Sequence, residues 1–195
     1  MEIIRYAALA PARWANGGGV TRQVAAGKAP GNEATPEPWD WRISIAEVAS
    51  AGPFSPMPGI ERIITIIEGE LIALTVDGVE HALEKYRPYR FSGDADTSAT
   101  LPTGNLMDLN LMARRGAVKG YMAIVELSKK RPHPVFAGQH AVLLQGTASV
   151  AGSDGSAPAE LGRYDTVVGA EDAPEISGRG FLAVLSIDPV EPDAG

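Results

Sequence analysis

The clearest pattern in the sequence is an alternation of apolar and polar residues with a period of two. In the segment 39–48, Trp41 and Ile43 stand at one parity, whereas Arg42 and Ser44 stand at the other. Successive side chains of a β-strand point to opposite faces, so this alternation predicts a strand with one apolar and one polar face.

Short apolar runs continue along the chain and are separated by turn residues. They occupy residues 63–67, 71–76, 79–83, 121–127 and 141–144. Gly69 separates the first two runs, and Asp77-Gly78, a dipeptide typical of tight β-hairpins, joins the second and third. The 22 glycines and 15 prolines also favour strands joined by turns over long helices. We therefore predict an all-β fold.

Two regions of the sequence repeat the same features under a nearly constant shift. Each aligned segment contains an apolar run, a glycine or an Asp-Gly turn. The aligned pairs are Ile66-Ile67-Glu68-Gly69 with Leu143-Leu144-Gln145-Gly146, Asp77-Gly78 with Asp154-Gly155, Leu83-Glu84-Lys85-Tyr86 with Leu161-Gly162-Arg163-Tyr164, and Gly104-Asn105-Leu106 with Gly180-Phe181-Leu182. Such features also recur by chance in β proteins, but several matches in order favour duplication of one β unit.

A duplicated β unit predicts how the chain is organised. One unit alone would leave a sheet face uncovered, so we expect two halves that pack together or each close as a sandwich. We place them at residues 1–116 and 117–195 of the 195-residue chain, which with 45% hydrophobic residues has enough apolar side chains to fill a core.

Charge and composition narrow the classes of partner and compartment. The 17 Lys and Arg residues against 24 Asp and Glu residues leave a net charge of −7, which argues against nucleic acid as a partner. The absence of cysteine rules out disulfides, thiolate nucleophiles and Cys-ligated metal. The start of the chain carries Glu2 and only a brief apolar stretch before Pro11, unlike a secretory signal, and no apolar run is long enough to span a bilayer. We expect a cytoplasmic protein without membrane association.

Several segments together resemble a known family. Glu68 to Gly78 resembles the strand, turn and strand in the middle of a cupin barrel. The more distinctive motifs are Trp14 to Arg22, Trp41 to Ala46, Gly52 to Ser55 with Pro58 to Arg62, and Asp108 to Gly116. In order and spacing these are similar to the HutD/Ves family. The distinctive motifs cover the first 116 residues, and Leu109 departs from the pattern because an aromatic residue is expected there.

The resemblance implies a fold and a role. It implies an all-β bicupin, two RmlC-like cupin halves packed together, found beside the enzymes of histidine breakdown. It also implies an accessory or regulatory protein with no firmly attached reaction, and a ligand such as urocanate or formylglutamate.

The histidines do not fit a cupin metal site. Metal-binding cupins present two His and a Glu from one strand pair and a third His from a later strand. This chain has only His81, His133 and His140, without any His-x-His, and Met107 occupies the place where a ligand His is expected. We therefore predict no metal and no cofactor.

Arg62 is the first candidate for ligand binding. It follows the proline-rich connection 51–59 and begins a strand, so its guanidinium could enter the mouth of the sandwich and hold a carboxylate through two N–H groups. The alternative is a surface arginine paired with Glu61 or Glu68. Glu68 shares its parity but lies roughly 20 Å farther along an extended strand.

Asp108 and Asn110 form a second candidate set. They share one strand parity, whereas Leu109 and Leu111 share the other. Inside a barrel such a polar pair fixes a ligand, and outside it is ordinary solvated surface. Arg42, at the polar parity of its own strand, is also a candidate, whereas Arg114-Arg115 is typical of a charge pair at a strand end.

The remaining candidates lie in connections. Gly17-Gly18-Gly19 could cradle an anion with its N–H groups, although a plain turn is favoured. Beside it, Asn16 and Trp14 would supply an amide and a stacking face, or pack the loop. Ser55 could contact ligand or cap its turn, and no Gly-x-Ser-x-Gly surrounds it, which argues against a hydrolase nucleophile.

The leading functional prediction is a non-catalytic bicupin that binds a small carboxylate metabolite. Arg62 would be the anion clamp, with Asn110, Ser55 and Asn16 as hydrogen-bond partners. One alternative is a metal-free isomerase or epimerase in which a His with a nearby Asp shuttles a proton; it gains support if His81 or His140 lines the same cavity as Arg62. Another is a protein-interaction module that pairs through edge strands, including a homodimer.

Overall fold

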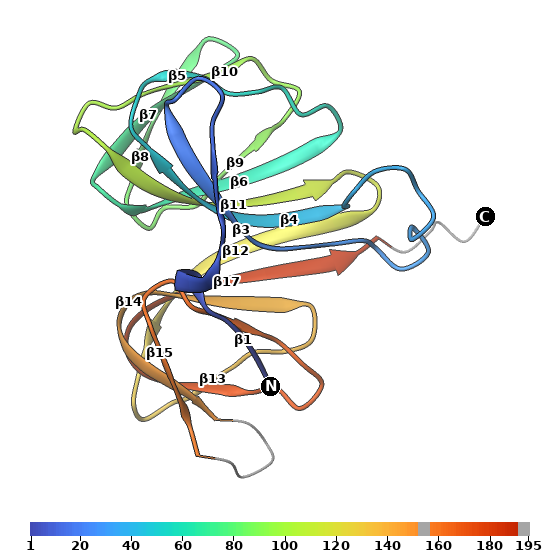
Figure 1. The fold of residues 1–195 in the computed structure, drawn as a ribbon, viewed down its shortest axis with the longest axis vertical. Helices are drawn as coiled ribbons and strands as arrows, with labels where there is room; N and C mark the ends of the chain where they lie inside the picture. Colours follow the sequence, from blue (N-terminus) through green and yellow to red (C-terminus); the bar gives the residue numbers. More distant parts are fainter. Residues whose placement is uncertain (152–156, 191–195) are drawn as a thin grey trace. The chain divides into compact units, whose positions relative to one another are not determined.

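The computed structural model describes residues 1–151 and 157–190 and confirms the all-β prediction (Figure 1). The described chain contains β-strands and one short 3-10 turn, η1 (Tyr6–Ala8). The expected turn at Asp154-Gly155 lies outside the described residues. No helix in the described part of the chain has the length and apolar character needed to cross a membrane.

The chain divides into two compact units, each described here by itself. The N-terminal unit comprises Ala10–Tyr121 together with the described residues from Ile187 onward. The C-terminal unit comprises Met122–Ser186 together with Met1–Leu9. The first nine residues, which the sequence analysis placed in the N-terminal half, therefore belong to the C-terminal unit, where β1 pairs with β16.

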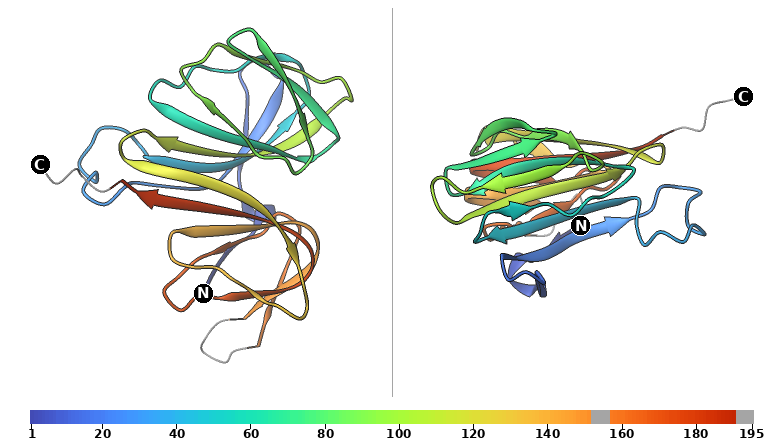
Figure 2. Two further views of the ribbon diagram at one scale, coloured as in Figure 1. Left: turned by 180° about the vertical axis from the view of Figure 1, so that it is seen from behind. Right: turned by 90° about the horizontal axis from the view of Figure 1, so that it is seen from above.

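Two sheets build the N-terminal unit. One sheet has six strands in the order β2-β3-β4-β11-β6-β9, and the other has four strands in the order β5-β10-β7-β8. Their bounds are β2 (Pro11–Arg13), β3 (Gly19–Gly27), β4 (Trp41–Val48), β5 (Gly52–Pro53), β6 (Ile60–Glu68), β7 (Leu71–Val76), β8 (Val79–Glu84), β9 (Tyr89–Ser92), β10 (Thr97–Thr100) and β11 (Leu106–Arg114). Within this unit, Figure 2 shows from behind and from above how the strands are layered.

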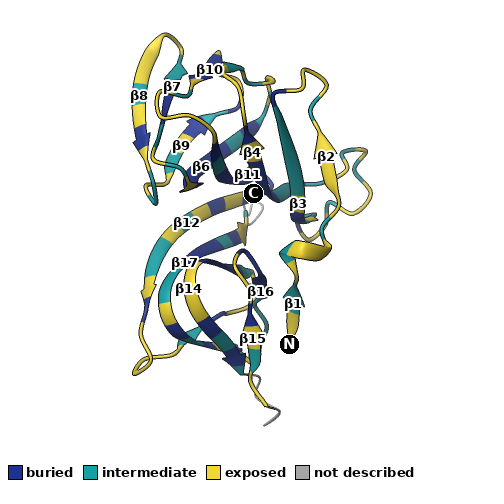
Figure 3. Ribbon diagram, turned by 60° about the vertical axis from the view of Figure 1, so that its left-hand side comes forward, coloured by how far each residue is buried: buried dark blue, intermediate teal, exposed yellow. Residues whose placement is uncertain are grey.

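An apolar core between these sheets holds the N-terminal unit together. Ile64 and Ile66 of β6 meet Ile72 and Leu74 of β7, and all four are fully buried. Burying a side chain of this size contributes about 1.5–3 kcal/mol to stability. The outer strand β8 is mostly exposed, which is visible in yellow in Figure 3.

The hairpin predicted at Asp77-Gly78 is confirmed. β7 and β8 pair antiparallel from Leu71↔Glu84 to Val76↔Val79. Asp77 and Gly78 have φ values of 48° and 80°, and two positive φ angles define the tight turn whose twist matches paired strands.

The C-terminal unit surrounds its own apolar core. Its sheet runs in the order β1-β16-β14-β17-β12, with β13 paired to β17 and β15 paired to β14. The strands are β1 (Glu2–Ile4), β12 (Val118–Leu127), β13 (His133–Pro134), β14 (Gln139–Ala151), β15 (Ala159–Leu161), β16 (Thr166–Val168) and β17 (Glu175–Pro189). The core includes Val135, Leu143, Val150, Leu182 and Val184.

The backbone supports the duplication. Tyr86 and Tyr164, which the sequence alignment placed together, both adopt positive φ, at 63° and 68°. The Tyr86 N–H donates to the carbonyl of Ile66 at 2.9 Å, and the Tyr164 N–H donates to the carbonyl of Leu143 at 2.7 Å. Positive φ is uncommon for residues other than glycine, so its recurrence at aligned positions with aligned acceptors points to one repeated unit.

Strand pairing refines this alignment. In the N-terminal unit a register shift in the β6–β11 pair places Ile66 opposite Asp108. In the C-terminal unit a shift in the β14–β17 pair places Leu143 opposite Leu182. Because Ile66 aligns with Leu143, Leu182 is the counterpart of Asp108. The sequence alignment had instead matched Leu182 with Leu106. That alignment was anchored on glycines, and a β-bulge, which shifts the pairing of two strands, cannot be seen in the sequence of either strand.

Gly146 offers a test of the close approach between the paired strands β14 and β17 in the C-terminal unit. Its φ is 102°, and a Cβ added there would lie 1.9 Å from the carbonyl oxygen of Arg179. We expect Gly146→Ala to lower the free energy of unfolding by about 3 kcal/mol or more, because positive φ and a backbone clash add. Gly78 has φ 80° and open space around it, so Gly78→Ala should cost only about 1–2 kcal/mol. Urea denaturation of the two variants measures the difference, and equal losses would contradict the clash.

Candidate functional site

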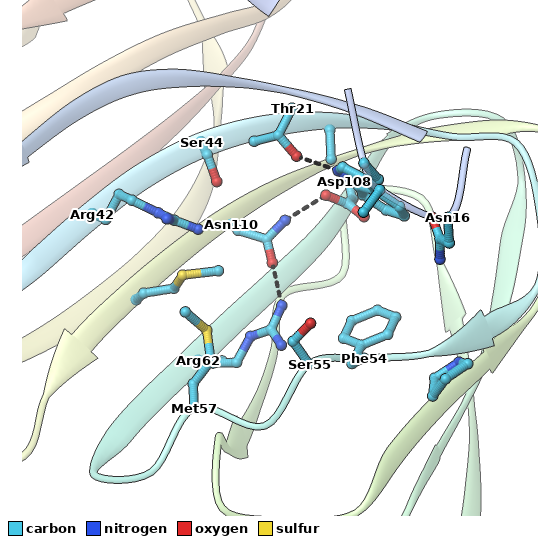
Figure 4. A pocket seen from close by; sticks show the side chains of 15 residues that line it. Asn16, Thr21, Arg42, Ser44, Phe54, Ser55, Met57, Arg62, Asp108 and Asn110 are labelled. Atoms are coloured by element: carbon cyan, nitrogen blue, oxygen red, sulfur yellow. Dashed lines mark hydrogen bonds between the residues drawn. The ribbon is translucent and has the colours of Figure 1, made fainter. Parts of the chain in front are cut away.

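A cavity of about 480 Å³ opens in the N-terminal unit. This volume is in the range of small-molecule sites. Its floor comes from β4, β11 and β6, and its rim comes from the turn between β2 and β3 and from the segment that follows β5 (Figure 4). The lining residues are Trp14, Ala15, Asn16, Thr21, Arg42, Ser44, Ala46, Pro53, Phe54, Ser55, Met57, Arg62, Asp108, Asn110 and Met112.

Strand register explains why the floor is polar. On the central strand β11, Met112 pairs with Arg42 of β4 and with Arg62 of β6. Asn110 pairs with Ser44 in the next row of the same face. Residues directly opposite each other in a sheet share a face, so the alternating positions of three strands converge on one cavity.

The other parity of the same strands is apolar. Leu109 and Leu111 of β11 and Ile43 of β4 are fully buried and do not line the cavity. The prediction that Asp108 and Asn110 share a face opposite to Leu109 and Leu111 is therefore confirmed in the geometry. These three strands are buried on both faces; the charged residues Arg42, Arg62 and Asp108 lie on the cavity side, and the other face holds the buried hydroxyl of Thr65 among apolar residues.

Arg62 is a buried cation held mainly by aromatic rings. It is 7% exposed, and its guanidinium carbon lies 4.9 Å from the Phe54 ring centroid and 5.0 Å from that of Phe91. One terminal N–H group donates to Oδ1 of Asn110 at 3.4 Å, and the buried Nε has no partner among the described residues. Burial lowers the pKa of Arg62 to about 10, so the side chain remains charged at neutral pH.

Asp108 and Asn110 lie next to Arg62 in a single hydrogen-bonded chain. Nδ2 of Asn110 donates to Oδ1 of Asp108. Asp108 is 2% exposed, and burial raises its pKa to about 7, although the charge of Arg62 and the Asn110 hydrogen bond act in the opposite direction. The carboxyl group is therefore close to its titration point at neutral pH.

Arg42 brings a second guanidinium to the same floor. Burial lowers its pKa, its Nε is buried without a partner in the described chain, and its guanidinium carbon lies 5.3 Å from the Trp39 ring centroid. Repulsion from the positive charge of Arg42 also contributes to the lowered pKa of Arg62, so the two guanidinium groups interact electrostatically. In Figure 4 both side chains extend toward Asn110 from different strands. Two cations against one carboxyl group with a pKa near 7 make this cavity positive and suited to an anion.

The rim is built by internal hydrogen bonds. Nε1 of Trp14 donates to Oγ1 of Thr21 at 2.8 Å, and the Gly18 N–H donates to Oδ1 of Asn16 at 2.9 Å. Gly17, with φ 72°, donates its N–H to the Trp14 carbonyl at 3.0 Å. The N–H groups of Gly17 and Gly18 are used inside the turn, which agrees with the plain-turn interpretation.

The structure brings all seven sequence candidates to one cavity. These are Trp14, Asn16, Arg42, Ser55, Arg62, Asp108 and Asn110. The alternative ion pairs expected for Arg62 with Glu61 or Glu68 do not form, since Glu61 pairs with Arg115 at 2.9 Å. Arg115 and Arg114, at the end of β11, are ion-paired outside the cavity, as expected for strand-end charges.

Sequence reasoning missed several lining residues. Ser44 shares the parity of Arg42, and Met112 shares the parity of Asn110, so strand parity alone could have identified both. Phe54 and Met57 had no such signal, because they lie in an irregular connection whose path depends on the whole unit.

The second unit does not repeat this polar floor. With Leu182 as the counterpart of Asp108, the strand pairing makes Val184 the counterpart of Asn110, and both apolar residues belong to the core of the C-terminal unit. Gln139 aligns with Arg62 and donates from Nε2 to Ser186 at 3.1 Å. The charged residues Arg62 and Asp108, together with the amide of Asn110, therefore distinguish the N-terminal unit from its repeat.

The donor set of the cavity does not fit a cupin metal. The lining residues include one carboxylate, Asp108, and no imidazole. His81 packs its ring 4.8 Å from Tyr89, and His140 lies in the C-terminal unit, where burial lowers its pKa to about 4. Two guanidinium groups in the same cavity would also repel a cation.

Fold and cavity together define the class of protein. Two β units related by an internal repeat, one of them with a polar cavity, make this chain a bicupin. A cupin 2 conserved barrel domain protein from Leptotrichia buccalis shares the fold, with a TM-score of 0.59 at 13% identity over 97% of this chain and 96% of that one.

The family follows from the sequence match. A model of the HutD family matches residues 6–184, so the chain belongs to the HutD family. HutD from Pseudomonas fluorescens SBW25 is 27% identical, with a TM-score of 0.77 over 97% of this chain and 99% of that one. Protein Ves from Citrobacter koseri is 39% identical over 115 residues, and the alignment covers 58% of each chain. The match thus spans less than two thirds of that curated relative.

Proposed function

We propose that this chain is a non-catalytic binding protein that takes a small carboxylate metabolite into the cavity of its N-terminal unit. The observation that carries the proposal is a pair of guanidinium groups, the buried Arg62 and the half-buried Arg42, neither of which has a direct carboxylate partner among the described residues. A buried cation without a directly bonded carboxylate is costly, and a ligand carboxylate that accepts two parallel N–H bonds would relieve that cost.

Family membership supports a more specific role. We infer an accessory or regulatory function in histidine utilisation, with urocanate or formylglutamate as the ligand, because the chain belongs to the HutD family and its motifs carry the resemblance that implies this role. In such a role occupancy of the cavity reports the concentration of a pathway intermediate. A cytoplasmic location and a homodimer are part of this proposal.

The enzymatic alternative has less support from the cavity. An isomerase or epimerase needs a base or acid beside the ligand. The expected histidines, His81 and His140, do not line the cavity that contains Arg62, which leaves Asp108 as the one carboxyl group among the lining residues. Product formation from a candidate substrate that is lost with His81→Ala or His140→Ala would favour the enzyme over the binding protein.

Removing the guanidinium of Arg62 tests the proposed function. We expect Arg62→Met to weaken binding of urocanate or formylglutamate about 30-fold or more, because two charge-assisted hydrogen bonds are lost while an apolar chain of similar length remains. Isothermal titration calorimetry measures the affinity.

The matched control is Arg131→Met, which removes an exposed arginine of the C-terminal unit and should leave binding unchanged. If neither urocanate, formylglutamate nor histidine produces heat with the wild-type chain, the proposal is wrong. Equal weakening by both substitutions would place the binding site elsewhere.

A further inference from the structure

The amide of Asn110 has a fixed orientation in the cavity. Its nitrogen donates to Oδ1 of Asp108, and its oxygen accepts from Arg62 at 3.4 Å. Turning the amide over would place its N–H group against the guanidinium and its oxygen against the carboxylate, which breaks both bonds. The side chain of Asn110 therefore separates a donor end, at Arg62, from an acceptor end, at Asp108 (Figure 4).

The acceptor end is incomplete. Asn110 uses one oxygen of Asp108, and no residue in the described ranges donates to the other. Asp108 is 2% exposed, and buried carboxylates normally accept several hydrogen bonds. Because Asp108 lines the cavity, a donor to this oxygen comes from solvent or from a ligand inside the cavity.

We propose that Asp108 is a specificity-determining residue, and that its second oxygen accepts an N–H group of a ligand whose carboxylate is held by Arg42 and Arg62. This inference rests on the proposed function, since it assigns the second end of a ligand whose first end is the carboxylate. The ligand class is then a monocarboxylate that carries an N–H donor, such as an N–H heterocycle or an amino acid.

Charge balance gives the same ligand class. Two guanidinium groups, one ligand carboxylate and an ionised Asp108 sum to zero inside the cavity. A dicarboxylate that spans the cavity places a second negative group against Asp108, and like charges at contact distance are strongly repelled in a buried site. Asp108 therefore selects against a second anion as well as for a donor. Formylglutamate carries two carboxylates, so of the two ligands proposed above urocanate is the one favoured.

The sharpest test uses two ligands that differ in the donor alone. Urocanate has an imidazole ring on an acrylate chain, and 3-(2-furyl)acrylate has the same chain with a furan ring that has no N–H group. At about pH 8.5, Asp108 is ionised and a free imidazole is neutral. We expect calorimetry to give an affinity for urocanate that is about tenfold higher or more, because furan leaves the buried acceptor unpaired.

Substitution of Asp108 assigns that preference to one side chain. In Asp108→Asn, Asn110 still donates to the new oxygen, so an amide N–H group faces the ligand. The second ring nitrogen of a neutral imidazole can accept from that group, so this variant should only reduce the preference for urocanate. In Asp108→Leu neither a donor nor an acceptor faces the ligand, and the preference should fall to near one. Arg62→Met weakens both ligands and should preserve their ratio. Asp108→Leu is a second variant suited to the fold, since Leu182 occupies the counterpart position of the repeat.

The outcomes separate the two proposals. If the wild-type chain binds both ligands equally and Arg62→Met weakens both, Asp108 does not select the donor and the carboxylate proposal stands. A preference for urocanate that persists in both Asp108 variants also overturns the inference. If neither ligand binds, both proposals are wrong.

Discussion

A triple variant with Arg62→Met, Asp108→Leu and Asn110→Val is expected to be more stable than the wild-type chain at about pH 8 and to lose carboxylate binding. The three side chains form one buried polar network whose hydrogen bonds leave Nε of Arg62 unpaired. Replacing a buried ion pair or triad with apolar residues of similar volume often stabilises a protein by about 1–4 kcal/mol.

The repeated half of the chain makes this substitution reasonable. Its core has Leu182 and Val184 at the positions that correspond to Asp108 and Asn110, so leucine and valine are compatible with this strand pairing. We therefore expect the polar network to lower the stability of the N-terminal unit while it provides a binding site, as is common in functional cavities.

Asn110→Val alone should have the opposite effect. It removes the hydrogen bond to Asp108 and the hydrogen bond to Arg62 while both charges stay buried, so we expect a loss of about 2–3 kcal/mol. Urea denaturation at one pH compares the three proteins. If the triple variant is less stable than the wild-type chain, the network contributes more to folding than its desolvation costs, and the argument is wrong.

The strands were predictable from the sequence because their signals are local. Alternation in β4, the continuous apolar run of β6 and the Asp77-Gly78 hairpin depend only on neighbouring residues. The cavity could also be anticipated, since Arg42, Arg62, Asp108 and Asn110 have parities that place them on one face once β11 lies between β4 and β6.

Other features depend on contacts between segments far apart in the sequence. Pairing of β1 with β16 assigns the first residues to the C-terminal unit, and short strands such as β1 leave no pattern of their own. The rings of Phe54 and Phe91 beside Arg62 could not be predicted, because Phe54 lies in an irregular segment. The register shift between β6 and β11 determines which residue of the C-terminal unit corresponds to Asp108. Such a shift can be seen only when the two strands are paired.

The stability of the chain should also depend on pH through Asp108, and the sign follows from the raised pKa. Burial raises the pKa of Asp108 from 3.8 to about 7 in the folded chain. Between about pH 4 and pH 7 the folded chain keeps a proton that the unfolded chain has lost. The contribution of Asp108 to stability therefore falls as pH rises through this window, by up to about 1.4 kcal/mol per pH unit, and levels off above it.

His140 opposes this trend in the wild-type chain. Burial lowers the pKa of His140 from 6.5 to about 4, so below pH 6.5 the unfolded chain binds a proton that the folded chain does not. Its contribution to stability falls as pH falls, and His133, whose pKa is also lowered by burial, acts in the same direction. Between about pH 4 and pH 6.5 the effects of Asp108 and His140 partly cancel, so the wild-type stability alone does not reveal Asp108.

The difference between the wild-type chain and Asp108→Asn isolates the carboxyl group. Asparagine does not titrate and keeps the hydrogen bond from Asn110, while His140 and His133 contribute equally to both proteins and cancel in the difference. We expect the two proteins to have similar free energies of unfolding near pH 4.5, and the variant to become more stable by a few kcal/mol near pH 8. Urea denaturation at pH intervals measures this difference. A constant difference across the range would show that Asp108 has an ordinary pKa and that the cavity does not desolvate it.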